Sequence, residues 1–423
     1  MNDEQGLLRA VSWRDLCPWL IIFRVYRLAV HAWVLLLATL AVLLTPLGWR
    51  VGEYLLLRED RTAIEALDQS RDEPGNLHRW PKVREAAPTA DEFRRFDLAR
   101  RVYAQAAGDV ASVFHGLVEP FRQLLDYRWT LAEFAFFLGG GLWTLAVWAF
   151  FGGVITRWAI VQLADEQYIG IRSAAGYATR RFPTYFLAPL FPFLGIVFLA
   201  AALAFFGLLL RLGEVGTLIA GVLWLVVLAG GFAMAYLLLG LLFGWPLMWI
   251  AVSADNADLF ESVSRAYAYT RQAPLRYLFY ALVAVLFGGL CWLLIQLFTE
   301  AVIWLSWWGV SWGAGRQLVV DLHNAVAAFD TSSTAESASS AGPALIGVWT
   351  AFVRTVATGF VFGFFWCAYC AIYLLLRHDV DKREMDEVWR PAGPPSPASQ
   401  SPSRPALSPT DVAENSMQAP TSS

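Results

Sequence analysis

Residues 218–252 read LIAGVLWLVVLAGGFAMAYLLLGLLFGWPLMWIAV and contain no Asp, Glu, Lys, Arg or His. Residues 186–210 are equally free of ionisable side chains. A helix needs about 20 predominantly apolar residues to cross the hydrocarbon core of a bilayer, and each run exceeds that length. The two runs predict an all-α, polytopic membrane protein.

The composition of the whole chain agrees with this class. Of 423 residues, 57% are hydrophobic and 16% are charged, whereas average soluble domains have roughly 45–50% and about 25%. The formal net charge is −3, so the chain lacks the basic surface that nucleic acids require. We therefore expect a bilayer as the main partner and no nucleic acid.

We predict a helical bundle of about six transmembrane helices, at about residues 28–47, 134–156, 185–210, 217–252, 277–298 and 356–376. The predicted organisation begins with a cytoplasmic N-terminal segment (1–27), the first transmembrane helix (28–47) and an external, mainly helical segment (48–130). Transmembrane helices two to five follow, with two cytoplasmic interfacial helices (131–298). The chain then continues with an external loop rich in Trp and Ser (299–343), the sixth transmembrane helix (344–377) and a cytoplasmic, disordered tail rich in Pro and Ser (378–423). Pro46-Leu-Gly48 is expected to end the first helix. The fourth is longer than a bilayer requires, so it is expected to break or to emerge from the membrane near Gly244-Trp-Pro246.

The orientation follows from the short connections, because Arg and Lys accumulate on the cytoplasmic side. Basic residues gather before the first span, after the second, after the fourth and after the sixth: Arg9, Arg14, Arg24, Arg27, Arg172, Arg180, Arg181, Arg265, Arg271, Arg276, Arg377, Lys382 and Arg383. The two shorter stretches on the opposite side hold only Arg211 and Arg316. Both termini are therefore predicted to be cytoplasmic.

The two external segments carry their own signals. Thr89-Ala-Asp-Glu92 matches a capping box, and apolar residues recur from Phe93 to Phe121 at helical spacing. This helix is expected to lie against the membrane domain, with partner binding as the alternative. In the second segment, the Trp-rich stretch 301–312 is expected to lie flat on the outer membrane surface.

Two cytoplasmic connections share one pattern at a constant offset. Ser173, Ala175, Thr179, Arg180 and Pro183 align with Ser264, Ala266, Thr270, Arg271 and Pro274. Each connection is predicted to form a short amphipathic helix that a Pro separates from the next span, with Asp165 or Asp255 favouring the N-terminus of that helix. The pattern has two interpretations: a duplicated two-helix unit, or a design that any two hairpins would share.

These connectors are the candidate contact sites of the chain. Their polar and Pro positions, predicted to meet lipid headgroups or a protein partner, are Ser173, Thr179, Arg180, Pro183, Ser264, Thr270, Arg271 and Pro274. Glycine-rich helix faces, such as Gly240-x-x-x-Gly244 and Gly359-x-x-x-Gly363, allow close helix approach. Packing within the bundle is the expected use of those faces, and homodimerisation is the alternative.

Residues for catalysis, cofactors or metals are not predicted. The five histidines are scattered, and Cys367 and Cys370 lie inside the sixth span, where we expect packing. Gly309-Val-Ser311-Trp-Gly313 matches a nucleophile motif, but it lacks the required strand-to-helix turn. His31 is placed about one turn into the first span, and Arg157 and Arg354 are placed at interface level, where their stems can snorkel.

Four stretches carry a resemblance to a known family: Glu119–Arg122 (EPFR), Phe151–Arg157 (FGGVITR), Tyr185–Pro192 (YFLAPLFP) and Leu374–Asp381 (LLLRHDVD). Together they resemble uncharacterised bacterial multi-pass integral membrane proteins over most of residues 24–389. The resemblance implies the bacterial inner (cytoplasmic) membrane. More loosely, the connectors resemble those of the membrane domain found beside some glycerophosphodiester phosphodiesterases. The catalytic barrel and metal carboxylates of those enzymes are missing from the sequence, so no such activity is implied.

The sequence favours a non-enzymatic inner-membrane protein, either an envelope scaffold or an accessory subunit of a membrane complex. The alternative is a permease-like transport component that uses the duplicated span pair and therefore needs a polar pocket at mid-depth. A membrane hydrolase built on Ser311 is a remote third hypothesis.

Overall fold

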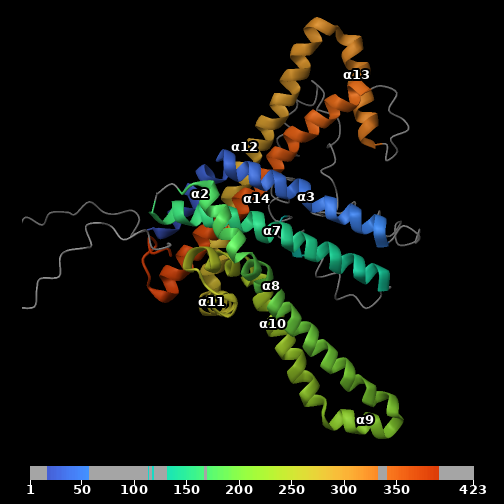
Figure 1. Cartoon of the computed structure of the whole chain (residues 1–423), viewed down its shortest axis with the longest axis vertical. Helices are drawn as coiled ribbons and strands as arrows, with labels where there is room; N and C mark the ends of the chain where they lie inside the picture. Colours follow the sequence, from blue (N-terminus) through green and yellow to red (C-terminus); the bar gives the residue numbers. More distant parts are fainter. Residues whose placement is uncertain are drawn as a thin grey trace, which may run out of the picture. The chain divides into compact units, whose positions relative to one another are not determined.

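The computed structural model describes residues 17–56, 113, 117–118, 131–165, 169–331 and 341–389. Every regular element within these ranges is a helix (Figure 1). Six helical stretches of the described chain are long and apolar enough to cross a membrane: Ala32–Leu55, Phe134–Ala164, Ile171–Val222, Trp224–Asp255, Pro274–Ala314 and Ala341–Asp381. The predicted all-α polytopic architecture is confirmed.

The chain begins with a 3-10 turn, Pro18–Leu20, and two helices, α2 (Ile21–Ala29) and α3 (Ala32–Leu56). One face of α2 buries Ile22, Val25 and Leu28, and this helix packs on α14. The first span was predicted to end at Pro46, but α3 continues through Pro46 to Leu56. Packing sustains the helix beyond the proline, because the buried Trp49 indole donates to the Thr144 hydroxyl at 3.0 Å.

His31 lies in the break between α2 and α3 and not inside the span. Its ring is 4.7 Å from that of Trp158 on α7 (Leu131–Asp165). At the other end of α3, Trp143 of α7 donates to the Leu44 carbonyl at 3.0 Å. The order of these contacts makes α3 and α7 an antiparallel pair.

A second pair is formed by α8 (Ile171–Gly207) and α10 (Trp224–Asp255), which are joined by the 3-10 helix Leu208–Leu212 and α9 (Gly213–Val222). The first connector is not a separate short helix as predicted, since α8 runs through Pro183. Helix α10 also does not break near Gly244-Trp-Pro246, which was one of the two alternatives predicted there. The fourth span is interrupted at Leu223 instead, and α10 passes through Pro246.

The rest of the described chain comprises α11 (Leu259–Gln272), α12 (Pro274–Ala314), α13 (Arg316–Thr331) and α14 (Ala341–Asp381). The second connector forms the predicted short helix, α11, and Pro274 starts α12. The Trp-rich stretch 301–312 does not form a separate surface helix, because it continues α12. Gly315, at a φ of +82°, then allows the reversal into α13.

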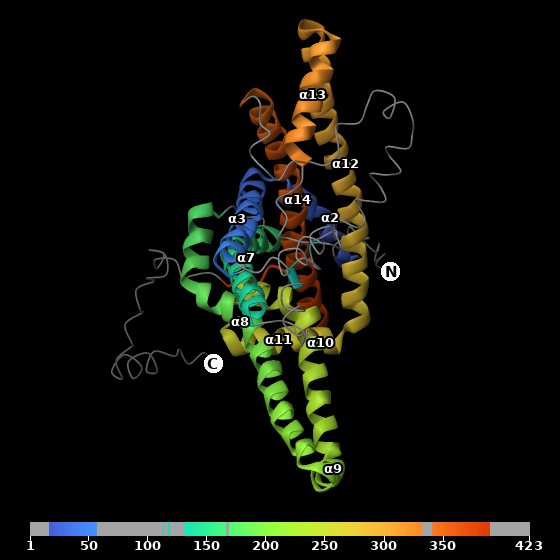
Figure 2. The same cartoon turned by 90° about the vertical axis from the view of Figure 1, so that its right-hand side faces the viewer.

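The three helix pairs, α3 with α7, α8 with α10 and α12 with α14, run in different directions from a shared region (Figures 1 and 2). We call this region the base and define it as residues 21–31, 156–165, 171–185, 249–280 and 369–385. It contains α2, α11, the C-terminal ends of α7, α10 and α14, and the N-terminal ends of α8 and α12. Each short connection predicted to be cytoplasmic adjoins it.

The glycine faces pack within the chain. A Cβ at Gly240 would meet the Tyr267 ring of α11, and one at Gly359 would meet α3. From the predicted helix 93–121, Val113 and Leu117 are buried in the core of the bundle. The capping box at 89–92, the loop at 332–340 and the tail beyond 389 lie outside the described residues.

Candidate functional site at the base of the helix pairs

The C-terminal end of α10 is the centre of the base. Asn256 adopts a left-handed conformation, with a φ of 55°, and ends the helix. Two residues later, Asp258 caps α11 by accepting from the Glu261 amide at 2.8 Å. Asp255 was expected to favour the N-terminus of α11. It does not cap that helix, because its carboxylate faces arginines from α11 and α14.

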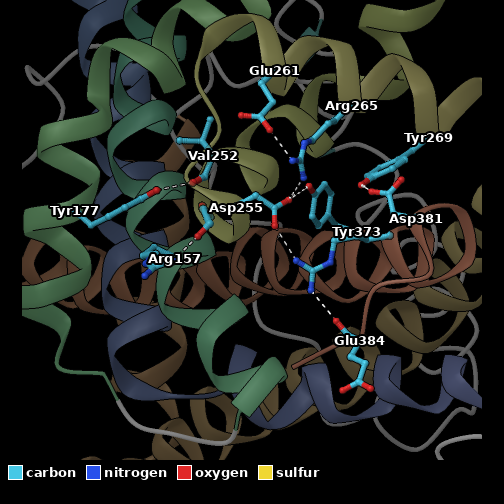
Figure 3. Close-up of polar contacts among 12 residues, drawn as sticks. Arg157, Tyr177, Val252, Asp255, Glu261, Arg265, Tyr269, Tyr373, Asp381 and Glu384 are labelled. Carbon is cyan, nitrogen blue, oxygen red and sulfur yellow. Dashed lines mark hydrogen bonds and ion pairs between the residues drawn. The ribbon is translucent and has the colours of Figure 1, made fainter. Parts of the chain in front are cut away.

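Three side chains donate to the Asp255 carboxylate (Figure 3). Arg377 of α14 binds Oδ1 at 2.8 Å, and Arg265 of α11 binds Oδ2 at 2.6 Å. Tyr373, one turn before Arg377, donates its hydroxyl to Oδ2. A single carboxylate therefore ties the end of α10 to two other helices.

The arginines around Asp255 have further partners. Arg265 also pairs with Glu261 at 2.6 Å, and Arg377 donates to the Glu384 carbonyl at 3.1 Å (Figure 3). The Arg377 side chain is 0% exposed. Because burying an unpaired charge is very costly, the ionic balance of two arginines with two carboxylates lets this guanidinium lie inside the protein.

A second set of contacts satisfies the last carbonyls of α10, which have no partner within a helix. Arg157 of α7 donates to the Ser253 carbonyl at 2.6 Å, and Tyr177 of α8 donates to the Val252 carbonyl at 2.6 Å. The Arg157 guanidinium also lies 4.5 Å from the centre of the Tyr177 ring, a cation–π geometry. These donors link α7 and α8 to the same turn of α10.

Three hydroxyl groups next to Arg157 extend the network, those of Thr156, Tyr185 and Ser253. The Ser253 hydroxyl lies 2.7 Å from the hydroxyls of both Thr156 and Tyr185. The Tyr185 carbonyl accepts from the Trp249 indole at 2.7 Å. All four side chains are buried, so the polar groups of this layer are satisfied by one another.

Two tyrosines of α11 show how strongly the base is shielded from water. Burial raises the pKa of Tyr267 to about 12, and its hydroxyl donates to the Leu237 carbonyl at 2.6 Å. Burial also raises the pKa of Tyr269 well above its usual value, and the adjacent Asp381 carboxylate raises it further. Both phenols therefore remain neutral donors at physiological pH.

No family model, curated protein or solved structure matches this chain. The role of the base is therefore inferred from its geometry alone. The described residues contain no group of three or more His, Cys, Asp or Glu side chains placed to hold a metal ion. What the arrangement does is hold five helices, α7, α8, α10, α11 and α14, at one junction.

The eight sequence-predicted contact residues lie on the outer side of this junction. Seven of them are exposed, and Thr270 is half-buried: Ser173, Thr179, Arg180, Pro183, Ser264, Thr270, Arg271 and Pro274. The two threonines behave alike, since Thr179 donates to the Ala175 carbonyl at 2.9 Å and Thr270 donates to the Ala266 carbonyl at 3.0 Å. The matched pattern thus corresponds to matched local geometry.

The side chains that form the network are not part of the matched pattern. Tyr177 aligns with Ala268 of the second connector, and Arg265 aligns with Ala174 of the first. The second connector has two further long-range donors at unmatched positions, because Tyr267 donates to the Leu237 carbonyl and Tyr269 donates to the Asp381 carboxylate. The matched pattern therefore does not identify the donors of the network, which lie at positions where the two connectors differ.

Three arginines have protein partners that the sequence did not predict. Arg157, 4% exposed, is enclosed within the base and donates to the Ser253 carbonyl. Arg354 pairs with Glu300 of α12 through two contacts of 2.9 and 3.0 Å. Arg377 was read only as part of a basic tail. The sequence feature that could have indicated a buried role for Arg377 is Tyr373, which lies four residues before it and therefore on the same helix face.

The remaining sequence candidates lie away from the base. Ser311 lies within α12 and donates to the Trp308 carbonyl at 2.6 Å, so it does not form a strand-to-helix elbow. His323 of α13 stacks edge-on against Trp307. Cys367 and Cys370 are free thiols buried in α14, and Cys370 contacts the Thr156 carbonyl at 3.6 Å.

Proposed function

We propose that this protein is a non-enzymatic integral protein of the bacterial inner membrane that acts as an envelope scaffold or as an accessory subunit of a membrane complex. In this proposal, the base lies at the cytoplasmic face and its exposed connectors contact a partner protein or lipid headgroups. The observation that carries the proposal is the ionic junction around Asp255. Together with the contact of Tyr177 to the Val252 carbonyl, this junction holds both connectors on the same end of α10 while their polar residues face outward.

The distribution of charge supports this orientation. Arg172, Arg180, Arg271 and Arg276 are exposed at the base, as positive residues on a cytoplasmic face would be. At the far end of the second helix pair, Arg211 is the basic residue of the connecting turn. Reporter fusions at Ser333 and Ser399 test the topology, and external and cytoplasmic signals, respectively, are expected. The reverse result would contradict the orientation.

The apolar lengths of the helix pairs fit a protein that works through contacts within the membrane. On α10, Leu225 is 77% exposed, and Phe198 of α8 and Phe232 of α10 are similarly open. Large exposed apolar surfaces on helices of this class face lipid or the helices of other membrane proteins. A rigid junction with free apolar helix pairs is the geometry expected of a scaffold.

A charge reversal tests the role of the base. The double variant Arg180→Glu/Arg271→Glu changes both exposed connector arginines, and Arg211→Glu makes the same change at the opposite end. After affinity purification from native membranes, we expect a stoichiometric partner to co-elute with the wild type and with the Arg211 variant, and to be lost with the double variant. A wild-type protein that elutes alone and shows intrinsic turnover would contradict the proposal.

The permease alternative gains little support from the described residues. It requires a polar pocket at mid-depth, whereas the cavity found there, between α7, α8 and α10, is lined almost entirely by apolar side chains. The hydrolase alternative also gains little, because the Ser311 hydroxyl is engaged by its own helix.

A further inference from the structure

A pocket of about 450 Å³ lies at the turn between α11 and α12, beside the last turn of α14. This volume falls within the roughly 300–1,000 Å³ of small-molecule sites. Two charged side chains line the pocket, Arg276 of α12 and Asp379 of α14. The pocket therefore offers a ligand one positive and one negative group, unlike the apolar cavity between α7, α8 and α10.

Both charged groups keep hydrogen-bonding capacity for a ligand. Arg276 faces Asp379 through Nη1, which lies 3.1 Å from Oδ1, and its side chain is 59% exposed. A guanidinium has five N–H donors, so most of them remain open to the pocket. Asp379 also accepts from the Tyr280 hydroxyl through Oδ2 at 2.8 Å, which leaves about two of the four lone-pair positions of a carboxylate. One ligand can therefore contact both side chains.

The two charges together favour a zwitterionic ligand. The planar guanidinium of Arg276 matches the oxygens of a phosphate. The neighbouring Asp379 carboxylate repels a ligand that carries only negative charge and attracts an ammonium group. A phosphate joined to a primary ammonium, as in phosphoethanolamine, satisfies both side chains. The trimethylammonium of choline carries the same charge but has no N–H to donate to the carboxylate.

The pocket also adjoins an apolar stripe that fits lipid tails. Leu275, which lines the pocket, is 81% exposed. The stripe continues from Leu275 through three further exposed residues of α12: Leu278, Phe279 and Leu282. Their spacing places them on one helix face, and the stripe reaches about 12 Å beyond Pro274 at 1.5 Å per residue. A soluble zwitterion would leave this face uncovered, whereas the acyl chains of a phospholipid cover it.

We propose that this pocket binds an ethanolamine phospholipid, with its phosphate on Arg276, its ammonium on Asp379 and its acyl chains along the stripe of α12. The proposal rests on the proposed function, which places the base at a membrane surface, and deepens it by naming the lipid class. Pro274, one of the predicted contact residues, lines the same pocket.

The first test changes the ligand and leaves the protein intact. The full-length wild type in detergent is titrated with dioleoyl phosphatidylethanolamine and its mono-, di- and trimethylated forms, and bound lipid is measured by native mass spectrometry. This series removes the N–H donors one by one at constant charge. We expect the unmethylated lipid to bind roughly 3- to 10-fold more tightly than the trimethylated one, with the largest loss at the third methyl group. Equal binding of all four lipids would overturn the proposal.

The second test changes the pocket. Asp379→Asn should reduce the preference for the unmethylated over the trimethylated lipid by at least about threefold, whereas Arg276→Gln should weaken both lipids by a similar factor. The matched controls are Asp321→Asn on α13 and Arg211→Gln at the far end of the second helix pair, and both should bind as the wild type does. A full preference in Asp379→Asn would overturn the role of the carboxylate. If Asp379→Asn does not fold, the methylation series still decides.

A competition experiment separates a lipid from a soluble ligand. Glycerophosphoethanolamine has the same headgroup without acyl chains, and it should not displace the lipid at equal concentration. Displacement would show that the stripe contributes nothing and would overturn the lipid assignment. These assays need no partner protein and no membrane orientation, so their failure leaves the scaffold proposal standing. A wild type that elutes alone but keeps the lipid preference would contradict the partner contact and leave this site intact.

Discussion

Replacing Asp255 by Asn tests whether the junction at the base is ionic. The substitution keeps the size of the side chain and removes the charge that two arginines share. Arg265 retains Glu261 as a partner, but Arg377 is left fully buried with only the Glu384 carbonyl and the neutral amide. We therefore expect Asp255→Asn to destabilise the protein mainly through Arg377.

The magnitude follows from burial. Removing one member of a buried ion pair costs about 3–5 kcal/mol, because the remaining charge is uncompensated. Arg377→Met leaves Asp255 bonded to Arg265 and Tyr373, so its expected cost is that of lost charged hydrogen bonds, about 1.5–3 kcal/mol. The double variant Asp255→Asn/Arg377→Met also removes the guanidinium charge that Asp255→Asn leaves uncompensated. It should be more stable than Asp255→Asn alone, so the coupling energy should exceed the cost of Arg377→Met and approach about 3 kcal/mol.

The assay is unfolding of the purified protein in mixed micelles by increasing mole fractions of sodium dodecyl sulfate, followed by tryptophan fluorescence and circular dichroism. Coincidence of the two signals checks two-state behaviour. Glu214→Gln, at an exposed carboxylate of α9, should change stability by less than about 0.5 kcal/mol. If Asp255→Asn matched this control, or if the double variant were as unstable as the sum of the single ones, the ionic account of the base would be refuted.

Other predictions concern packing, pH and the far end of the third helix pair. Gly359→Val should lower the free energy of unfolding by about 1–3 kcal/mol by overpacking α14 against α3. Gly289→Val, whose Cβ meets nothing within 4 Å, should lower it by less than about 1 kcal/mol. Equal losses of stability in the two variants would contradict the close packing of Gly359 on α3. Because burial raises the pKa of Tyr267 to about 12 from 10, the unfolded chain releases this proton at lower pH than the folded one. The contribution of Tyr267 to stability should be complete below pH 10 and fall as pH rises toward 12; a difference titration of tyrosinate absorbance against Tyr267→Phe that shows ionisation near 10 would refute this. Glu300→Gln should lower stability by about 1–3 kcal/mol by breaking the half-buried pair with Arg354, and a further charge change at Arg354→Gln should add little in the same unfolding assay.

The helical class and most spans were predictable because they depend on long apolar runs. The expectation that proline ends a helix failed at three positions. Pro46, Pro183 and Pro246 all lie inside helices, since the loss of one backbone hydrogen bond is small beside the packing of the turns on either side. Pro274 does start a helix, because the backbone of Ala273 before it is not helical.

The network at the base was beyond prediction because its partners lie far apart in sequence. Asp255 and Arg377 belong to different spans, and no local pattern shows which helix ends meet. Hydropathy also treats Arg157 as the edge of a span, although packing places it inside the protein. The repeat correctly directed attention to both connectors. It could not identify Tyr177 or Arg265, because both occupy positions at which the repeat diverges.

The length of α12 has a consequence for how far this protein extends from the membrane. Its 41 residues span about 60 Å at 1.5 Å per residue, roughly twice the thickness of a hydrocarbon core. Transmembrane helices seldom tilt beyond about 40°, and this tilt brings only the first 39 Å or so, up to Glu300, within the core. In the orientation proposed above, with Pro274 at the cytoplasmic surface, the indole-bearing end of α12, with α13 folded back beside it, is expected to form a stiff stalk in the headgroup layer and beyond.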